Sequence, residues 1–119
     1  MAPKPMKKFL VTYHLTAVAR KQAAKMQKDM TPEMHKGVMD AWGAWAQKCG
    51  DQLVDMGAPI GASLRLDSAG AGNAKAGIGG YSVVQAKSIA GAKKLFRKHP
   101  HLGWLEKGCS IEIHEITAM

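Results

Sequence analysis

The sequence predicts a single domain of the mixed α+β class, in which helices cover one face of an antiparallel sheet. The main observation is the order of its segments. Short β-branched or aromatic runs and segments of helical periodicity follow one another as strand, helix, strand, strand, helix and strand. Composition agrees, because 46% of the 119 residues are hydrophobic and 22% are charged, which suits one globular domain with its own core.

The first strand is predicted over Lys8 to His14, a short run rich in aromatic and β-branched residues. Side chains alternate along a strand, so the run has an apolar face and a mixed face. The apolar face carries Phe9, Val11 and Tyr13. The opposite face carries Leu10, Thr12 and His14.

Two helical segments follow the first strand. Residues 17–30 are rich in Ala, Lys and Gln but have a weak apolar stripe, which predicts a short exposed helix or an irregular excursion. Thr31 then offers a capping hydroxyl, and Pro32 suits the first helical turn. A periodic stripe predicts the main amphipathic helix from there to Gly50. The stripe consists of Met34, Val38, Ala41, Trp45 and Cys49.

The second strand is predicted in two pieces. Residues 53–56 begin an extended segment, Gly57-Ala58-Pro59 breaks it, and residues 60–67 continue it as a second strand or a hairpin arm. Residues 68–78 consist mostly of Ala and Gly, which predicts a flexible loop.

The last third repeats the strand, helix, strand order. A third strand is predicted over residues 80–85, and Ser88 caps a helix that Pro100 stops. The last strand covers residues 110–116, where Ile alternates with Glu and His. The complete βαββαβ order is that of the ferredoxin-like motif.

Five segments resemble a known family when they are taken together. They are residues 34–50 with Trp42-Gly43-Ala44-Trp45, residues 53–60, residues 79–86, His99-Pro100-His101-Leu102, and residues 110–113. In this order they resemble the YCII-related family, whose relatives include the DGPF-domain proteins. The length of the chain predicts one domain over residues 1–119, and the charged start predicts a flexible basic tail over residues 1–6. The resemblance implies a homodimeric α+β barrel, in which two ferredoxin-like sheets pack through the faces that their own helices leave open.

A candidate catalytic group lies on that open face. If Phe9 and Val11 face the helices, alternation turns His14 to the other side, together with Glu112 and His114 of the last strand. The first and last strands are neighbours in this topology, so we expect the three side chains to converge in a cavity bounded by the dimer mate. Two imidazoles and a carboxylate can transfer protons near neutral pH. The same group can instead hold a divalent metal, or form hydrogen bonds within a dimer interface.

Five further residues are candidates for substrate binding. Thr12 lies on the first strand, Ser82 on the third strand, and Arg65 and Asp67 on the second. His101 follows the second helix, where a loop residue on a rigid scaffold can lie at the mouth of the site. We expect no metal or other cofactor, because neither cysteine has a CxxC partner and the glycines do not form a dinucleotide-binding motif.

Charge and hydropathy limit the partners. The net charge is +8, but no aromatic residues are interleaved with the lysines of the basic N-terminal third, which makes a nucleic-acid partner an unfavoured expectation. No apolar run approaches the ~20 residues that span a bilayer. The N-terminus lacks the apolar region and small-residue cleavage site of a signal peptide, which predicts a cytoplasmic protein.

Two functions remain after these exclusions. The first is the binding of a small organic molecule in the cavity of a homodimeric barrel, with lyase-like or isomerase-like proton transfer as the chemistry that His and Glu side chains offer. The second is a non-catalytic interaction or assembly module of the same fold. The absence of an acid at Ala69 to Ala76, where DGPF-type relatives carry Asp-Gly-Pro-Phe, favours the second.

Overall fold

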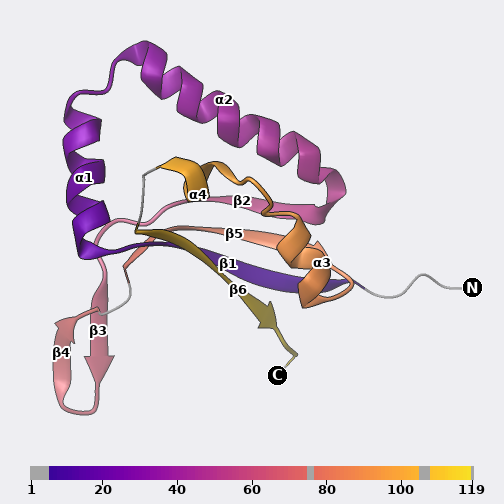
Figure 1. Ribbon diagram of the computed structural model, residues 1–119. Coiled ribbons are helices and arrows are strands. Elements are labelled where there is room, and N and C mark those ends of the chain that lie inside the picture. The colour runs from indigo at the N-terminus through magenta and orange to yellow at the C-terminus, as the bar shows by residue number, and fades with distance from the viewer. Residues whose placement is uncertain (1–5, 75–76, 105–107, 119) are drawn as a thin grey trace, which may run out of the picture.

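A four-stranded antiparallel sheet forms the centre of the protein (Figure 1). The computed structural model describes residues 6–74, 77–104 and 108–118. The sheet has the order β2-β5-β1-β6. Its strands are β1 (Lys7–Leu15), β2 (Leu53–Pro59), β5 (Ile78–Ala86) and β6 (Cys109–Ile116). This arrangement confirms the predicted α+β class.

The helices lie on one side of this sheet (Figure 1). They are α1 (Ala17–Lys28), α2 (Pro32–Cys49), α3 (Ile89–Lys94) and α4 (Pro100–Trp104), and a 3₁₀ turn at Gly50–Gln52 follows α2. The first two begin at capped positions. The Thr16 hydroxyl accepts a hydrogen bond from the Ala19 amide, and the Thr31 hydroxyl accepts one from the Met34 amide, each at 3.1 Å. Residues 17–28 therefore form a regular helix despite their weak apolar stripe.

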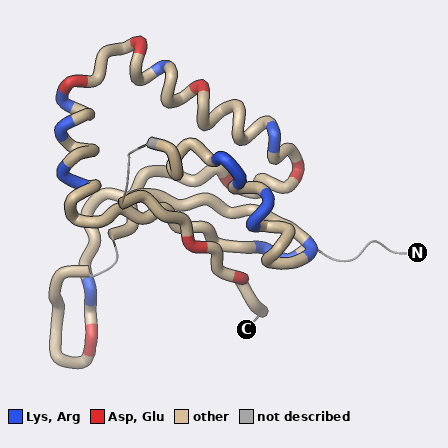
Figure 2. The backbone as a smooth tube through the Cα atoms, viewed as in Figure 1, with Lys and Arg blue, Asp and Glu red and all other residues tan. Residues whose placement is uncertain are grey.

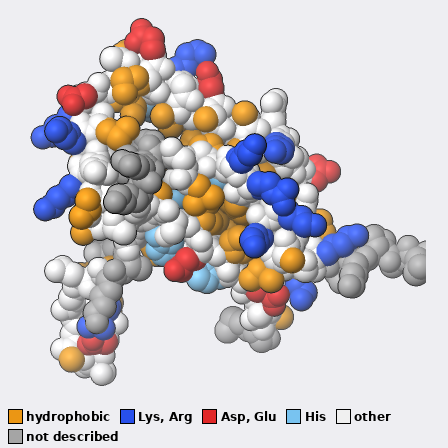
Figure 3. All heavy atoms as spheres, viewed as in Figure 1, with side chains coloured by type: hydrophobic (Ala, Val, Ile, Leu, Met, Phe, Trp, Pro, Cys, Tyr) orange, Lys and Arg blue, Asp and Glu red, His pale blue; other side chains and the backbone are white. Residues whose placement is uncertain are grey.

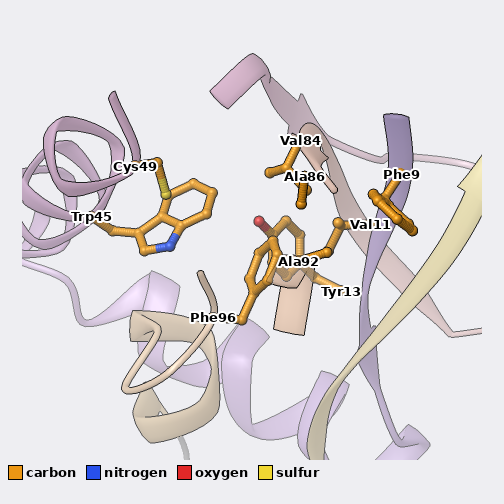
Figure 4. Packing of buried hydrophobic residues seen from close by; sticks show 9 residues of the cluster. All are labelled: Phe9, Val11, Tyr13, Trp45, Cys49, Val84, Ala86, Ala92 and Phe96. Atoms are coloured by element: carbon orange, nitrogen blue, oxygen red, sulfur yellow. The ribbon is translucent and has the colours of Figure 1, made fainter. Parts of the chain in front are cut away.

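The core lies between the sheet and the helices (Figure 4). The predicted apolar face of β1 is fully or nearly fully buried there, and Trp45 and Phe96 pack against it from the helical side. The indole of Trp45 also donates a hydrogen bond to the carbonyl of Leu95 at 2.7 Å. The buried cluster consists of Phe9, Val11, Tyr13, Trp45, Cys49, Val84, Ala86, Ala92 and Phe96. Because alternate residues of β1 point into this core, its polar side chains are left on the uncovered face.

The second strand differs from the prediction. Strand β2 continues through Gly57-Ala58-Pro59, because two register shifts against β5 and a left-handed Gly57 (φ +82°) let the chain bulge without leaving the sheet. Of the two alternatives for residues 60–67, the structure shows the hairpin arm, because these residues do not extend the four-stranded sheet. The chain after β2 forms a separate hairpin of β3 (Leu64–Asp67) and β4 (Gly70–Asn73), and β4 occupies part of the predicted loop.

The second helical region also differs from the prediction. Helix α3 ends at Lys94, and a turn that contains Lys98 with φ +58° leads to Pro100. Pro100 does not stop a helix but begins α4. This position suits proline, because the first helical residue needs no amide donor and its φ is already helical. The turn and α4 direct His99 and His101 inward, and both side chains are buried.

The molecule is flat and open. Its radius of gyration is 16.2 Å, whereas a compact domain of this length has about 13.5 Å, and its shortest dimension is 20 Å. The hairpin projects from the body of the protein, and one face of the sheet carries no helix (Figure 1). No helix in residues 6–74, 77–104 or 108–118 is long and apolar enough to cross a membrane.

Candidate functional site

The predicted catalytic group converges on the uncovered face of the sheet. One carboxylate oxygen of Glu112 lies 3.5 Å from the Nε2 atom of His14 and 3.3 Å from the Nε2 atom of His114. Strand pairing explains the convergence, because Thr12 lies opposite Glu112 and Leu10 lies opposite His114. An acidic side chain between histidines is visible in Figure 3. The three side chains therefore converge as the alternation along the two strands predicted, and their catalytic role stays a prediction.

Thr12 joins the cluster as predicted. Its hydroxyl lies 2.7 Å from Nε2 of His14 and 3.4 Å from Nε2 of His114, and the residue is only 7% exposed because the larger side chains surround it. His14 is the more enclosed of the two histidines, whereas Glu112 and His114 are about half exposed. The cluster can exchange protons, but it lies on an open surface of the single chain.

Arg65 and Asp67 do not reach this cluster, so the expectation that they join it is wrong. They lie on β3 in the projecting hairpin, where their side chains form an ion pair with each other at 3.0 Å. The physical reason is the path of β2. Because Leu53–Pro59 occupies the edge of the sheet beside β5, the residues after it have no strand of that sheet to pair with.

Ser82 was expected on the open face, and the structure places it on the opposite one. It pairs with Val11 across the β1–β5 ladder, so its side chain shares the buried face. Its hydroxyl donates to the carbonyl of Met56 at 2.7 Å. The hydroxyl of Tyr13, also 2.7 Å away, must then donate to Ser82.

His101 is buried on the helical side and does not lie at the mouth of the open-face cluster. Its Nε2 atom lies 3.0 Å from the carbonyl oxygen of His14 and must donate to it. Burial lowers the pKa of the His101 imidazole below its ordinary value. This side chain fixes α4 to the end of β1, and it belongs to a second region that sequence reasoning did not identify.

That second region is a cavity of about 900 Å³ between α1, α2, α4 and the sheet. Its lining is almost entirely apolar and includes aromatic side chains such as Tyr13 and Trp42. Five methionines contribute to it from α1, the α1–α2 connection, α2 and β2. They are Met26, Met30, Met34, Met39 and Met56. Hydrophobic side chains are exposed at the centre of the face shown in Figure 3.

His99 lines the inner end of this cavity and is enclosed by aromatic rings. Its ring centroid lies 4.5 Å from those of Trp42 and Trp45, both nearly perpendicular to it, and 5.1 Å from the stacked ring of Tyr13. Burial lowers its pKa to about 3, so the imidazole is neutral at physiological pH. The aromatic rings exclude the water that would solvate a charged imidazole, so they favour the neutral form.

The hydrogen bonds of His99 define its tautomer. Its Nδ1 atom accepts from the backbone amide of His101 at 3.0 Å, so the proton of the neutral ring lies on Nε2. That buried Nε2 has no hydrogen-bond partner among the described residues. The perpendicular indoles provide only weak N–H to π contacts. The Nε2–H group of His99 is therefore a buried donor that could still form a hydrogen bond.

Tyr13 is a further polar side chain at the inner end of the cavity. Burial raises the pKa of its phenol to about 12, although the hydrogen bond with Ser82 acts in the opposite direction. The phenol is therefore protonated at neutral pH and serves as a donor to Ser82. The polar groups at this end of the cavity are all uncharged at neutral pH.

The described residues contain no group of three or more His, Cys, Asp or Glu side chains arranged to hold a metal ion. Part of the sequence pattern pointed to the cavity: Met26, Met30 and Met34 recur at four-residue spacing, and His99-Pro100-His101 follows closely after a helix. The sequence pattern alone could not show the packing that brings these segments together.

The chain matches no known family description, and no curated protein is significantly similar to it.

Proposed function

We propose that this protein binds a small, largely apolar organic molecule in the cavity between α1, α2, α4 and the sheet. One observation carries the proposal. The cavity of about 900 Å³ has an apolar lining and a few polar groups at its inner end, which is the usual composition of a small-molecule site. Such sites commonly hold 300–1,000 Å³, so the volume suits a drug-sized ligand.

The methionine lining supports an adaptable site. A thioether side chain is unbranched and polarizable, so it can repack around ligands of different outline and contact aromatic rings favourably. Five of the eight methionines of the chain line this one cavity. Trp42 and the enclosed His99 provide flat surfaces for a ring, and the unused Nε2 donor of His99 is a hydrogen-bonding group for a ligand that displaces an indole.

Two glycines of α2 allow a direct test. Gly37 lines the cavity and Gly43 does not, and a Cβ atom added at either position meets nothing within 4 Å. We expect Gly37→Phe to fill the cavity and weaken ligand binding at least tenfold, whereas Gly43→Phe leaves binding unchanged. The neutral probe is 4-phenylbutan-1-ol, and binding is followed by NMR of methionine methyl groups, with Met6 as an internal reference outside the cavity.

The outcome against the proposal is also clear. The site is absent if the probe leaves the methyl signals of Met26, Met30, Met34, Met39 and Met56 unmoved at concentrations up to its solubility. Equal binding by the Gly37→Phe and wild-type proteins would place the ligand elsewhere. Circular dichroism of both variants separates a filled cavity from a misfolded chain.

We further propose that the protein is a YCII-related, ferredoxin-like domain that forms a homodimeric α+β barrel. The strand order β2-β5-β1-β6 and the placement of the helices on one face support the fold, and the residue segments that resemble the family support the membership. The uncovered sheet face and the large radius of gyration favour a dimer, because a second copy would cover Leu10 and Ile116, which are 38% and 49% exposed.

The cluster of Thr12, His14, Glu112 and His114 supports a second candidate function. In a dimer through the open faces it would lie between the two sheets, where its histidines and carboxylate could transfer protons to a ligand or join the copies as an assembly contact. The assembly reading has the stronger support. The ligand-sized cavity lies on the other side of the sheet, and His101 reaches from it to the backbone carbonyl of His14 rather than to the side chains of the cluster.

A further inference from the structure

The cavity has one charged lining residue among those that the structure describes. Lys98 lies at its rim, and every other lining residue is apolar, glycine, tyrosine or histidine. The two lining histidines do not supply charge, because burial lowers the pKa of His99 to about 3 and lowers that of His101. At neutral pH the cavity therefore combines an apolar body with a single cation at its edge.

Lys98 is also conformationally unusual. It is the single non-glycine residue with positive φ (+58°) in the described part of the chain, a conformation that favours Gly or Asn and costs a lysine free energy. The turn after α3 would accommodate glycine more easily. A strained residue at the rim of a cavity suggests a functional reason for its side chain.

The electrostatic surroundings favour an anion at this rim. No carboxylate of the described residues forms an ion pair with Lys98. Basic residues gather along α3 and the turn that follows it, as well as along α1 (Figure 2). In Figure 3, Lys and Arg side chains lie beside the exposed hydrophobic area. A net charge of +8 adds a general attraction for anions.

We infer that the ligand of this cavity is an apolar carboxylate, whose hydrocarbon or aromatic body lies among the methionines and Trp42 and whose carboxylate pairs with Lys98. The inference rests on the proposed binding function and narrows it to one ligand class. A neutral molecule would form no ion pair with Lys98, and an organic cation would be repelled by it.

Three probes of equal shape test the charge preference. They are 4-phenylbutyrate, 4-phenylbutan-1-ol and 4-phenylbutylamine, titrated at pH 7 and low salt against the methionine methyl signals. We expect the acid to bind about fivefold more tightly than the alcohol, as one partly exposed ion pair would provide. We expect the amine to bind most weakly of the three.

Lysine variants assign the preference to one side chain. Lys98→Met should equalise the affinities for the acid and the alcohol, while Lys94→Met, which removes a charge from the end of α3 outside the cavity lining, should preserve the difference. Lys98→Gly separates function from folding. It removes the strained side chain, so it should raise the melting temperature and still abolish the preference for the acid.

The outcomes distinguish the two proposals. If the alcohol binds as tightly as the acid, or the amine binds best, the ligand class is wrong although the cavity remains a binding site. The same conclusion follows if Lys94→Met and Lys98→Met have equal effects. If none of the three probes shifts the methyl signals of the lining methionines, the binding function fails and the ligand class fails with it.

Discussion

The neutral imidazole of His99 makes the stability of this protein depend on pH. A histidine in an unfolded chain binds a proton near pH 6.5, but burial lowers the pKa of His99 in the folded state to about 3. Between these values the unfolded chain binds a proton that the folded chain does not, so stability falls as the pH falls. The lowered pKa of His101 acts in the same direction.

We expect the free energy of unfolding to fall by about 2 kcal/mol between pH 6.5 and pH 5 through His99 alone. The variant His99→Phe keeps a ring among Trp42 and Trp45 but cannot bind a proton, so its stability should decline less steeply with acid. Urea unfolding at several pH values measures how steeply the free energy of unfolding depends on pH. The slopes are compared, not the stabilities at one pH, because the variant also removes the acceptor for the amide of His101.

Exposed His35 on α2 provides the control for this slope. His35→Gln should retain the full dependence of the wild-type protein on pH. An unchanged slope in His99→Phe would contradict the lowered pKa and would mean that other groups govern acid unfolding.

At the level of elements, the bulge of β2 depends on one glycine. Gly57 has φ +82°, and a Cβ atom built on it would lie 1.6 Å from the carbonyl oxygen of Tyr81 in the neighbouring strand. We expect Gly57→Ala to destabilise the protein by about 3 kcal/mol or more, because left-handed strain adds to a clash between two paired backbones. Denaturant unfolding followed by tryptophan fluorescence measures the loss.

A second glycine close to the first makes the comparison specific. Gly61 follows β2, and a Cβ atom there meets nothing within 4 Å. Gly61→Ala should change the stability by less than about 0.5 kcal/mol. If both substitutions cost the same, the bulge would not be the feature that makes glycine necessary at position 57.

The same elements show what could be predicted from the sequence. Regular alternation in β1 and β6 was enough to place His14, Glu112 and His114 together, since both strands present one apolar and one polar face. Strand β5 lacks that alternation, because Val83 and Val84 are adjacent and Ser82 is small enough for either face. Its orientation therefore depended on the ladder with β1.

The cavity could not be predicted for a related reason. Methionines at four-residue spacing in one segment do not reveal that the α1–α2 connection holds them over the sheet. His99 likewise follows a lysine-rich helix, and only the turn at Lys98 directs it among the aromatic rings. Both features arise from tertiary packing between segments far apart in the chain.

At the level of the whole molecule, the uncovered sheet face should determine the oligomeric state. We expect the wild-type protein to sediment as a dimer and Leu10→Glu to sediment as a monomer, because burying an added carboxylate from each copy between two sheets costs free energy of desolvation. Val18→Glu on α1 is the control, since Val18 is more exposed than Leu10 but lies away from this face. Sedimentation velocity measures all three.

Further outcomes bear on the same face. A monomeric wild-type protein would contradict the proposed dimeric barrel. A dimeric Leu10→Glu variant would place the dimer interface on another surface. Glu112→Gln addresses the histidine cluster separately. If the cluster serves assembly, this variant weakens the dimer and leaves the binding of 4-phenylbutan-1-ol unchanged.

The strand order has a last consequence, which concerns two parts of the chain. If the chain is divided at the β3–β4 turn, strands β1, β2 and β3 come from the first part and β4, β5 and β6 from the second, and every ladder of the described residues joins a strand of one part to a strand of the other. Among these residues, neither part contains two strands that pair with each other. A chain cut between Asp67 and Gly70 would therefore assemble its sheet only when both fragments meet, so this hairpin is a natural split point for fragment complementation.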